Sequence, residues 1–351
     1  MKTDIQGTVS LLLDWFHQSG RELPWRKDTD PYHVWVSEIM LQQTRIETVL
    51  PYYARFMKAL PDIEALSQCP QEKLLKLWEG LGYYSRVRNM QKAAAVIAET
   101  YGGKFPERYE QIRTLPGIGD YTAGAIASIA FGEAVPAVDG NVLRVLTRLT
   151  GNESDVRKER AKKWAGELVR ELIPKQEPGA FNQALMEFGE VICLPSPENR
   201  CDQCFLKSFC QAYVCHKTDA IPYRSPANPK KTEEKTVLVI RDSAFYLFHR
   251  RSPKGLLAGM YELPNTDGFL SPQEAARKAE ELSGRTPLRV EELPPARHLF
   301  SHVEWRMKGY QVIVENMKEP RKDGYFLSTA AAALEKLAVP GAFRTYMKYV
   351  R

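Results

Sequence analysis

The stretch LPGIGDYTAGAIASIAFG, residues 115–132, decides how the first part of this chain folds. Gly117 and Gly119 flank one isoleucine, and a run of small residues follows that suits a helix beginning near Asp120. Glycines let a backbone pass close to another molecule, and the free N–H groups of a helix N-terminus attract phosphate. The five residues LPGIG alone fit a phosphate-binding hairpin or a plain turn equally well. The small residues that follow favour the hairpin, because they allow this helix to pack tightly.

Composition and periodicity divide the chain of 351 residues into two parts. Residues 1–217 show apolar residues at helical spacing, as in VWVSEIMLQQTRIETVLPYYARFMKAL, and no alternating strand. Residues 218–234 are proline-containing and poor in apolar residues, which predicts a linker. Residues 235–351 mix strand patterns with a helix capped by Ser271 and Gly284. The expected fold is therefore a mostly α N-terminal part followed by an α+β domain.

The charge balance permits a polyanionic partner without demanding one. The net charge is +6, and all of the excess lies beyond residue 218, where 22 Lys and Arg face 16 Asp and Glu. An ordinary solvated surface explains this equally well. No run approaches the ~20 apolar residues of a membrane helix, and the first residues lack a signal-peptide pattern. We expect a cytoplasmic protein that does not associate with a membrane.

Two carboxylates are candidates for chemistry, and each also has a structural interpretation. Asp139 precedes GNVLRVLTRL, so it suits a helix N-cap as well as a reactive site. Glu38, Gln42 and Arg45 fall at helical spacing on one polar stripe of an apolar segment. Glu38 could pair with Arg45 across that stripe. It could instead be a buried acid whose pKa is raised by desolvation.

Five of the six cysteines fall within 23 residues, which argues for a metal site in an intracellular chain. Seven, two and five residues separate Cys193, Cys201, Cys204 and Cys210. Four thiolates can hold zinc or an iron–sulfur cluster, and the single close pair favours the cluster. Cys215 is a spare thiol near the end of the loop, and Cys69 is isolated.

Six ordered blocks together resemble the helix-hairpin-helix DNA glycosylases, and within them the adenine DNA glycosylase (MutY) family. The blocks span nearly the whole chain: RELPWRKDTDPYHVWVSEIMLQQTRIETVLPYYARF, LWEGLGYYSRVRNM, LPGIGDYTAGAIASIAFG, AVDGNVLRVL, FNQALMEFGEVIC and HLFSHVEW. The resemblance implies a monomeric enzyme that flips adenine out of duplex DNA and removes it opposite 8-oxoguanine or guanine. It also implies a six-helix domain, a helical domain with a 4Fe–4S cluster in loop 193–210, and a MutT (Nudix)-like domain at 235–351.

The resemblance assigns roles to four residues around the sugar and the base. Glu38 would be the general acid that protonates the free nitrogen of adenine's five-membered ring. Asp139 would stabilise the positive sugar or trap it covalently, which is the two-carboxylate logic of glycoside hydrolysis. Tyr121 would support both carboxylates, and Asn141 would orient Asp139.

Other residues would surround the flipped base and the two strands, although core or surface roles remain open for each. The resemblance places the adenine pocket at Arg21, Trp25, Arg26, Leu41 and Ile46. It places contacts to the stack and strands at Gln43, Thr44, Leu81, Gly82, Tyr83, Gly117, Gly119 and Gln183. The loop that would read 8-oxoguanine is Phe300, Ser301 and His302, with Ser301 as the hydrogen-bonding residue.

An alternative is an endonuclease III-like glycosylase and lyase for oxidised pyrimidines. Those enzymes place a lysine at the position of Tyr121 and form an imine with the sugar, which a phenol cannot do. The chain also departs from the family it resembles in having seven residues, not six, between the first two cluster cysteines. In the last domain, Lys278 and Leu282 stand where the Nudix box has metal-binding glutamates. We therefore expect base recognition there without nucleotide hydrolysis.

Overall fold

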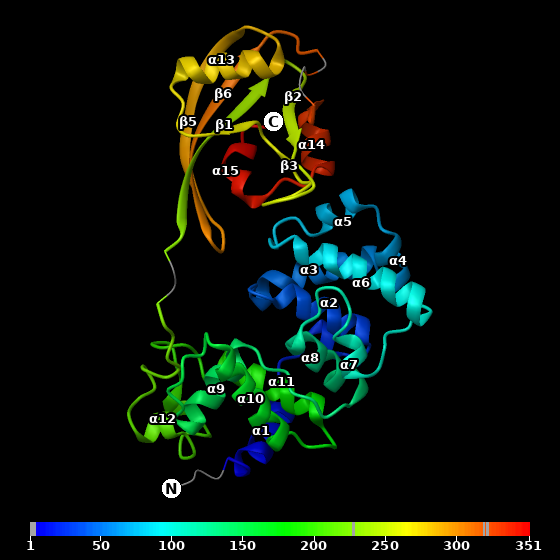
Figure 1. Cartoon of the computed structure of the whole chain (residues 1–351), viewed down its shortest axis with the longest axis vertical. Helices are drawn as coiled ribbons and strands as arrows, with labels where there is room; N and C mark the ends of the chain where they lie inside the picture. The colour runs from blue at the N-terminus through cyan, green and yellow to red at the C-terminus, as the bar shows by residue number, and fades with distance from the viewer. Residues whose placement is uncertain (1–4, 227–228, 319, 321–322) are drawn as a thin grey trace. The chain divides into compact units, whose positions relative to one another are not determined.

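The computed structural model describes residues 5–226, 229–318, 320 and 323–351, and the chain forms two compact units (Figure 1). The first unit comprises Met1–Gln68 and Arg88–Pro226, and the second comprises Cys69–Val87 and Ala227–Arg351. The fold class expected from the sequence, a helical part followed by an α+β part, is confirmed. The segment Cys69–Val87 differs from expectation, because it groups with the C-terminal part.

The first unit contains only helices and short 3₁₀ turns among its described residues. They are α1 (Gly7–Ser19), η1 (Pro24–Arg26), α2 (Pro31–Leu41), α3 (Ile46–Ala59), α4 (Ile63–Gln68), α6 (Ser85–Tyr101, from Arg88 onward), α7 (Tyr109–Ile112), α8 (Asp120–Phe131), α9 (Gly140–Thr150), α10 (Glu159–Leu172), α11 (Pro178–Val191), η2 (Cys201–Gln203) and α12 (Gln211–Val214).

The apolar segment 34–60 forms two helices and not one, which corrects the predicted polar stripe. Helix α2 ends at Leu41, and α3 begins at Ile46 after a turn in which Gln43 has a φ of 59°. Both helices bury apolar residues, so the apolar residues keep a helical spacing through the turn, although the backbone of the turn is not helical. Glu38 and Arg45 therefore do not lie on one helix face, and the interpretation of Glu38 as a partner of Arg45 is wrong.

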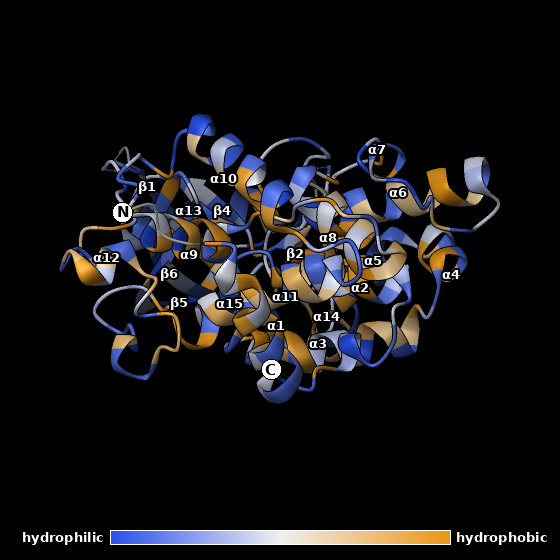
Figure 2. Ribbon diagram, turned by 90° about the horizontal axis from the view of Figure 1, so that it is seen from below, coloured by the Kyte–Doolittle hydropathy of each residue, from blue (hydrophilic) through white to orange (hydrophobic). Residues whose placement is uncertain are grey.

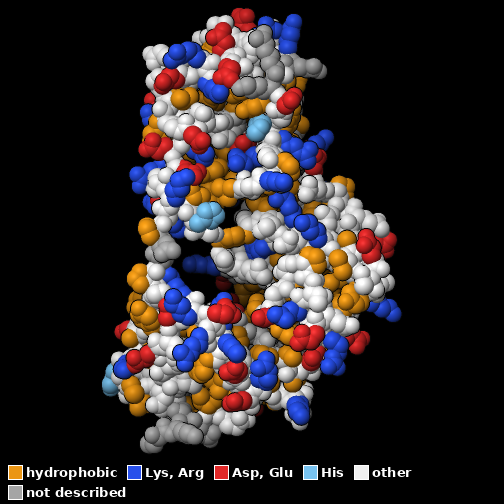
Figure 3. All heavy atoms as spheres, viewed as in Figure 1, with side chains coloured by type: hydrophobic (Ala, Val, Ile, Leu, Met, Phe, Trp, Pro, Cys, Tyr) orange, Lys and Arg blue, Asp and Glu red, His pale blue; other side chains and the backbone are white. Residues whose placement is uncertain are grey.

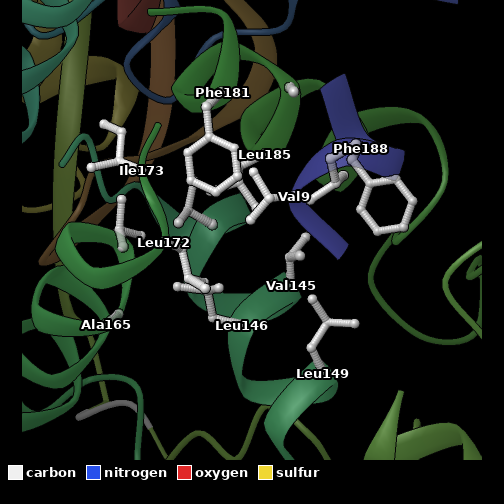
Figure 4. Close-up of a cluster of buried hydrophobic side chains, with 14 of the residues drawn as sticks. Val9, Val145, Leu146, Leu149, Ala165, Leu172, Ile173, Phe181, Leu185 and Phe188 are labelled. Atoms are coloured by element: carbon white, nitrogen blue, oxygen red, sulfur yellow. The ribbon is translucent and has the colours of Figure 1, made fainter. Parts of the chain in front are cut away.

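The hydrophobic core that supports the site lies between α1, α9, α10 and α11 (Figure 4). Helix α9 buries Val145 and Leu146 almost completely, and α11 does the same with Phe181 and Leu185. Each of these side chains removes apolar surface from water at roughly 25 cal/mol per Å². This packing fixes the direction of α9, and hence the position of the residue that caps its N-terminus.

Close approaches at two glycines hold the segment that leads to Asp139. A Cβ atom on Gly124 of α8 would lie 2.0 Å from the carbonyl oxygen of Pro136, and one on Gly179 would lie 2.7 Å from the Cα atom of Ile129. The helix predicted from the small residues therefore begins at Asp120 and packs tightly, as expected.

A buried asparagine fixes the same segment by hydrogen bonds. The Asn182 side chain donates to Ser128 Oγ at 2.8 Å and to the Val135 carbonyl at 2.9 Å. Its carbonyl oxygen accepts from the Ala137 N–H at 3.1 Å. A buried amide with all of these partners removed would be costly, so residues 135–137 are pinned to α8 and α11.

The second unit is built on a sheet with the strand order β3-β2-β1-β6-β5, in which β1 and β6 are parallel. Helix α13 packs on one face, and α14 and α15 pack on the other (Figure 1). The elements are α5 (Gln71–Leu77), β1 (Lys231–Arg241), β2 (Tyr246–Arg250), β3 (Tyr261–Glu262), β4 (Asn265–Asp267), α13 (Pro272–Ser283), β5 (Pro287–Leu299), β6 (Val303–Val314), β7 (Tyr325–Ser328), α14 (Ala330–Lys336), η3 (Gly341–Phe343) and α15 (Arg344–Met347).

Local signals in this unit are confirmed, whereas one boundary shifts. Ser271 and Glu274 form a capping box at the start of α13, and Gly284 ends the helix in the left-handed conformation. Strand β1 begins at Lys231, inside the segment 218–234 expected to be a linker. Residues 227 and 228 of that segment lie outside the described residues.

Polar contacts explain why residues 69–87 group with the C-terminal sheet. The Tyr261 hydroxyl donates to Glu72 Oε1 at 2.7 Å, and the Lys76 ammonium donates to the Leu334 carbonyl at 2.8 Å. None of these contacts has a sequence signature, because the partners are about 190 to 260 residues apart.

Hydrophilic and hydrophobic residues mix along most helices of the molecule (Figure 2). Lys and Arg are interspersed with Asp and Glu over the face seen in Figure 3. Within the parts of the chain that the structure describes, no helix is both long and apolar enough to cross a membrane.

Candidate active site

A cavity of about 1290 Å³ opens in the first unit, between η1, α2, the 41–46 turn, the glycine hairpin and the facing ends of α9, α10 and α11. Most of the residues that the sequence suggested for the site line this one cavity. They are Trp25, Arg26, Glu38, Leu41, Gln43, Thr44, Ile46, Gly117, Gly119, Tyr121, Asp139, Asn141 and Gln183.

Glu38 lies on α2 with its carboxyl group almost entirely buried in the wall of the cavity. The Tyr121 hydroxyl donates a hydrogen bond to Glu38 Oε2 and also contacts the Met186 sulfur at 3.2 Å. Burial raises the pKa of Glu38 to about 7, although the Tyr121 hydrogen bond opposes this, and the nearby charge of Asp139 raises it further. Glu38 is therefore a carboxyl group that can carry a proton at neutral pH.

Asp139 caps the N-terminus of α9 and lines the cavity at the same time. Its Oδ1 accepts from the Val142 N–H at 2.7 Å, and its Oδ2 accepts from Asn141 Nδ2 at 2.9 Å. Burial raises the pKa of Asp139 to about 6, and these hydrogen bonds restrain the rise. The two interpretations of Asp139 are thus compatible, because the cap leaves the carboxylate facing the cavity.

A buried arginine that the sequence analysis missed fixes the position of Asn141. Arg144 Nη2 donates to Asn141 Oδ1 at 2.8 Å and to the Gly189 carbonyl at 2.8 Å, and its Nε donates to the Cys193 carbonyl at 2.7 Å. A Cβ on Gly189 would lie 2.6 Å from the Cβ of Asn141, so α11 and α9 meet without intervening side chains. An arginine on the apolar face of α9 was the available signal.

A second missed feature is a buried carboxylate, Glu187 on α11. Arg21 and Arg26 each donate to Glu187 Oε2, at 2.8 Å and 3.0 Å. Burial alone would raise the pKa of Glu187, but the two arginines outweigh it and hold the pKa below its usual value. The cavity wall therefore contains a fixed anion. Gln183, Glu187 and Glu190 lie on one helix face, which the sequence would have shown.

The glycine hairpin has the geometry that its sequence suggested. Gly117 has a φ of 77°, and a Cβ there would lie 2.5 Å from the Asn89 Cβ. Gly119 caps α8, and a Cβ there would meet nothing within 4 Å. The backbone at Gly119 is therefore open to close approach from the cavity, next to a helix N-terminus that favours an anion.

Gln43 lies at the cavity with its backbone in the left-handed region, at φ 59°. Such a conformation costs of order 1 kcal/mol for a residue with a side chain, and it persists where the surroundings enforce it. The neighbouring Gln42 donates to Thr122 Oγ1 at 3.5 Å. The turn thus brings Gln43, which the resemblance assigns to a contact with the base stack, to the wall of the cavity.

Four cysteines line one small cavity near α9 and α11. The cavity measures about 30 Å³, and its walls include Cys193, Cys201, Cys204 and Cys210. Arg148 Nη1 lies 3.4 Å from the Cys193 sulfur, which places a positive charge beside the thiols. Within the described residues, no three His, Cys, Asp or Glu side chains gather at metal-binding geometry. Cys215 is exposed and does not line the cavity.

The remaining site residues lie in the second unit and do not line the large cavity. Ser301 Oγ donates to the Tyr83 hydroxyl at 3.3 Å, so the structure brings these two residues together. The Phe300 ring packs against Trp305, with the ring centroids 4.9 Å apart. Leu81 is buried and Gly82 is half-buried, whereas Tyr83 and His302 are exposed. In the first unit, Arg21 does not line the cavity itself, but it bonds Glu187 and Glu190, which do.

The chain matches two protein families in succession. Residues 36–171 match the HhH-GPD superfamily of base excision DNA repair proteins, and residues 236–349 match the NUDIX domain. A solved thermostable thymine-DNA glycosylase aligns with a TM-score of 0.54 and 29% identity, covering 60% of this chain and 96% of that one. A DNA complex of endonuclease III aligns with a TM-score of 0.52 and 24% identity, covering 62% and 98%, and so shows the fold alone.

Curated relatives identify the family more closely. The adenine DNA glycosylase of Mus musculus is 32% identical over 371 residues, which covers 89% of this chain and 72% of the relative. That of Buchnera aphidicola subsp. Baizongia pistaciae is 38% identical over 257 residues, which covers 72% of each chain. The chain therefore belongs to the adenine DNA glycosylase family.

Proposed function

We propose that this chain is a monofunctional glycosylase that removes adenine paired with 8-oxoguanine or guanine in duplex DNA of the bacterial nucleoid. The observation that carries the proposal is one cavity lined by two carboxyl groups, the buried Glu38 and the half-buried Asp139, whose pKa values are about 7 and about 6. Two carboxyl groups with separated tasks are what hydrolysis of a glycosidic bond requires.

The cavity would receive a nucleotide that has left the base stack. The backbone N–H groups at Gly119 and the start of α8 would hold a phosphate of the strand. Glu187 stays anionic between Arg21 and Arg26, so its carboxylate would accept a hydrogen bond from the amino group of adenine. An amino group in that place distinguishes adenine from bases that present a carbonyl oxygen there.

Glu38 would act as the general acid. With a pKa of about 7, a large fraction of Glu38 is protonated at neutral pH. Its Oε2 atom accepts a hydrogen bond from the Tyr121 hydroxyl, which holds the carboxyl group in position. Proton transfer to the free nitrogen of the five-membered ring makes adenine a neutral leaving group. General acid catalysis of this kind contributes typically 10²–10⁴-fold.

Asp139 would act on the sugar. With a pKa of about 6, this carboxylate is mostly ionised at neutral pH, and Asn141 and Val142 fix its two oxygens. It would stabilise the positive charge that develops as the bond to adenine breaks, or add to the sugar carbon before water replaces it. Either course ends in an abasic site with the strand intact.

Tyr121 separates this reaction from that of a lyase. An imine with the opened sugar needs an amine, and the residue between the two carboxyl groups is a phenol. Lys162 and Lys163 do line the cavity, on α10, and both are exposed to solvent. Lyase activity would have to use one of them, so a trapping experiment tests the alternative directly.

The four cysteines would hold a 4Fe–4S cluster. All four face one cavity, and Arg148 lies beside them, which suits the negative charge of four thiolates. Burial raises the pKa of the Cys204 thiol to about 12, so ligation would have to displace that proton. The cluster would close loop 193–210 against α9.

The C-terminal unit would read the base opposite adenine. In α13, Lys278 pairs with Glu281 at 2.8 Å and Leu282 is buried, so neither can hold the magnesium of a hydrolase. The loop 300–302 and Tyr83 present hydroxyl groups side by side, which suits hydrogen bonding to a purine edge.

We expect Glu38→Gln and Asp139→Asn each to lower single-turnover adenine release by at least about 10²-fold and to leave duplex binding unchanged. The substrates are duplexes with adenine opposite 8-oxoguanine, guanine or thymine, and thymine glycol opposite adenine, with and without borohydride. The unchanged protein should release adenine from the first two only and form no trapped adduct. Glu171→Gln, an exposed change on α10, is the control. Near-full activity of either variant, or efficient trapping on thymine glycol, would refute the assignment.

Glu38→Gln should also make the protein more stable at alkaline pH. The folded chain holds the Glu38 proton up to about pH 7, whereas the unfolded chain releases it near the ordinary value of 4.5. The folded state therefore binds more protons between about pH 4.5 and 7, and its stability falls as the pH rises through this window. The variant should gain up to about 3 kcal/mol at pH 8 and little at pH 4.5. Denaturant unfolding at both pH values measures this, and equal effects would contradict it.

Ser301→Ala combined with His302→Ala should reduce the preference for 8-oxoguanine over guanine as the opposite base. Adenine release opposite guanine should change little, because Glu38 and Asp139 are untouched. The ratio of the two single-turnover rates is the readout. Ser243→Ala, an exposed change in the turn between β1 and β2 of the same unit, is the control and should leave the ratio as it is. An unchanged ratio in the double variant would place lesion recognition on other residues.

Purified protein should contain iron and acid-labile sulfide and absorb visible light. Cys204→Ser should lose both, whereas Cys215→Ser should keep both, because Cys215 does not line the cysteine cavity. Colourless protein with one zinc ion, or loss of iron only in Cys215→Ser, would overturn the ligand set.

A further inference from the structure

A second, smaller cavity adjoins the large one at the first turn of α9. It measures about 160 Å³, and Gly140 and Leu143 line both cavities. Its other walls come from α9, from the loop before α10 and from the segment that follows the cysteine loop. Three of its lining residues are arginines, Arg144, Arg157 and Arg224, and no lining residue is acidic.

Within the described residues, none of the three arginines that line this second cavity, called here the arginine cavity, forms an ion pair with a carboxylate. Arg157 and Arg224 are exposed, and neither guanidinium makes an ion pair or hydrogen bond there. Arg144 is 5% exposed and uses its Nε and Nη2 on carbonyl and amide oxygens, which leaves Nη1 without an acceptor among the described residues. Burial lowers the pKa of Arg144, and the charge of Arg224 contributes to the same direction.

The walls of the arginine cavity are held in place before any ligand arrives. The Val156 N–H donates to the Tyr223 carbonyl at 3.1 Å and so joins the two loops that carry Arg157 and Arg224. The nearby carboxylate of Asp155 accepts from the backbone N–H groups of Arg157 at 3.0 Å and Ser225 at 3.3 Å. Asp155 therefore braces the loops and does not line the cavity.

An anion with several oxygens is the ligand that this chemistry fits. Guanidinium groups present forks of N–H donors that match phosphate geometry, and the N-terminal end of α9 adds a favourable dipole. A Cβ on Gly140 would meet nothing within 4 Å, so a phosphate can approach the backbone there. The volume exceeds that of several water molecules, each of about 30 Å³.

We propose that the arginine cavity binds a phosphodiester of the DNA strand whose nucleotide enters the large cavity. Gly140 follows Asp139 directly, so a phosphate seated there lies one residue from the carboxylate that acts on the sugar. The proposal rests on the proposed action on DNA. It adds a phosphate contact in a cavity that the glycine hairpin does not line, so that the flipped nucleotide would be held at two places.

The arginine cavity should govern binding and not the chemical step, because Arg157 and Arg224 do not line the large cavity. Each lost phosphate contact should lower the slope of log affinity against log salt by about 1. Affinity for the duplex should therefore fall most at low salt, whereas adenine release from the saturated complex should stay within about twofold.

The test compares Arg157→Gln/Arg224→Gln with Arg160→Gln, an exposed arginine on α10 that lines neither cavity. Affinity for a duplex containing adenine opposite 8-oxoguanine is measured from low to high salt, together with the single-turnover rate at saturation. We expect about a tenfold loss and a reduced salt slope for the double variant, and little change for Arg160→Gln. Equal losses in the two proteins would overturn the proposal.

Methylphosphonate substitution then identifies the phosphate. Single neutral linkages are placed at each position around the adenine, and the wild-type protein should lose affinity at one position where the double variant loses none. If the double variant and each neutral linkage lower the affinity independently at every position, the arginine cavity contacts no single phosphate and the proposal is refuted. Inorganic phosphate is the second probe: if it raises the melting temperature of the wild type only, while duplex affinity is equal in both proteins, the cavity binds free phosphate and not DNA.

The outcomes separate this proposal from the proposed function. A protein that binds duplexes through the arginine cavity but releases no adenine retains the phosphate seat and loses the catalytic assignment. A protein that releases adenine with an unchanged salt slope in the double variant retains the catalytic assignment and loses the seat. Arg157→Lys keeps the positive charge and should therefore retain most of the affinity that the double variant loses. This result would exclude misfolding as the cause of the loss in the double variant.

Discussion

The site depends on helices that approach one another without side chains between them. Gly124, Gly179 and Gly189 stand where α8, α9, α11 and the segment before Asp139 meet, and a Cβ at any of them would lie within 2.7 Å of a neighbouring atom. Asn182 bonds the same segment at three points. Because α9 starts where this packing puts it, its capping carboxylate faces Glu38 and Tyr121 across one cavity.

This packing also sets the electrostatics of the cavity. Among the acidic side chains that line it are Glu38, Asp139 and Glu187, and of these three only Glu187 has arginine partners, which keep its pKa low. Glu38 and Asp139 have hydrogen bonds but no ion pair among the described residues, so burial dominates and their pKa values rise. Differences in partners alone would thus give the proposed reaction a fixed anion at Glu187, a proton donor at Glu38 and an ionised carboxylate at Asp139. The two raised groups reduce stability at alkaline pH, a cost typical of functional sites.

Local signals in the sequence predicted well what depends on neighbouring residues. The glycine hairpin, the start of α8 at Asp120 and the N-cap at Ser271 follow from the backbone preferences of a few adjacent side chains. Features that depend on tertiary contacts were missed. The end of α2 and the start of α3 around residues 42–45 cannot be seen in the sequence, because the buried residues of both helices follow the same helical spacing. The pairing of Glu187 with Arg21 was missed because these residues are 166 apart in the chain.

Helix α9 contributes walls to the three cavities of the first unit. Its N-cap faces the large cavity, Arg144 links Asn141 to the Cys193 carbonyl, and Arg148 donates to the Leu194 carbonyl at 2.7 Å. The same helix forms a wall of the arginine cavity. A rigid helix of this length transmits a displacement at one end to the other, because packed cores move as bodies and do not deform continuously. Closing the cysteine loop would therefore act on the position of Asp139.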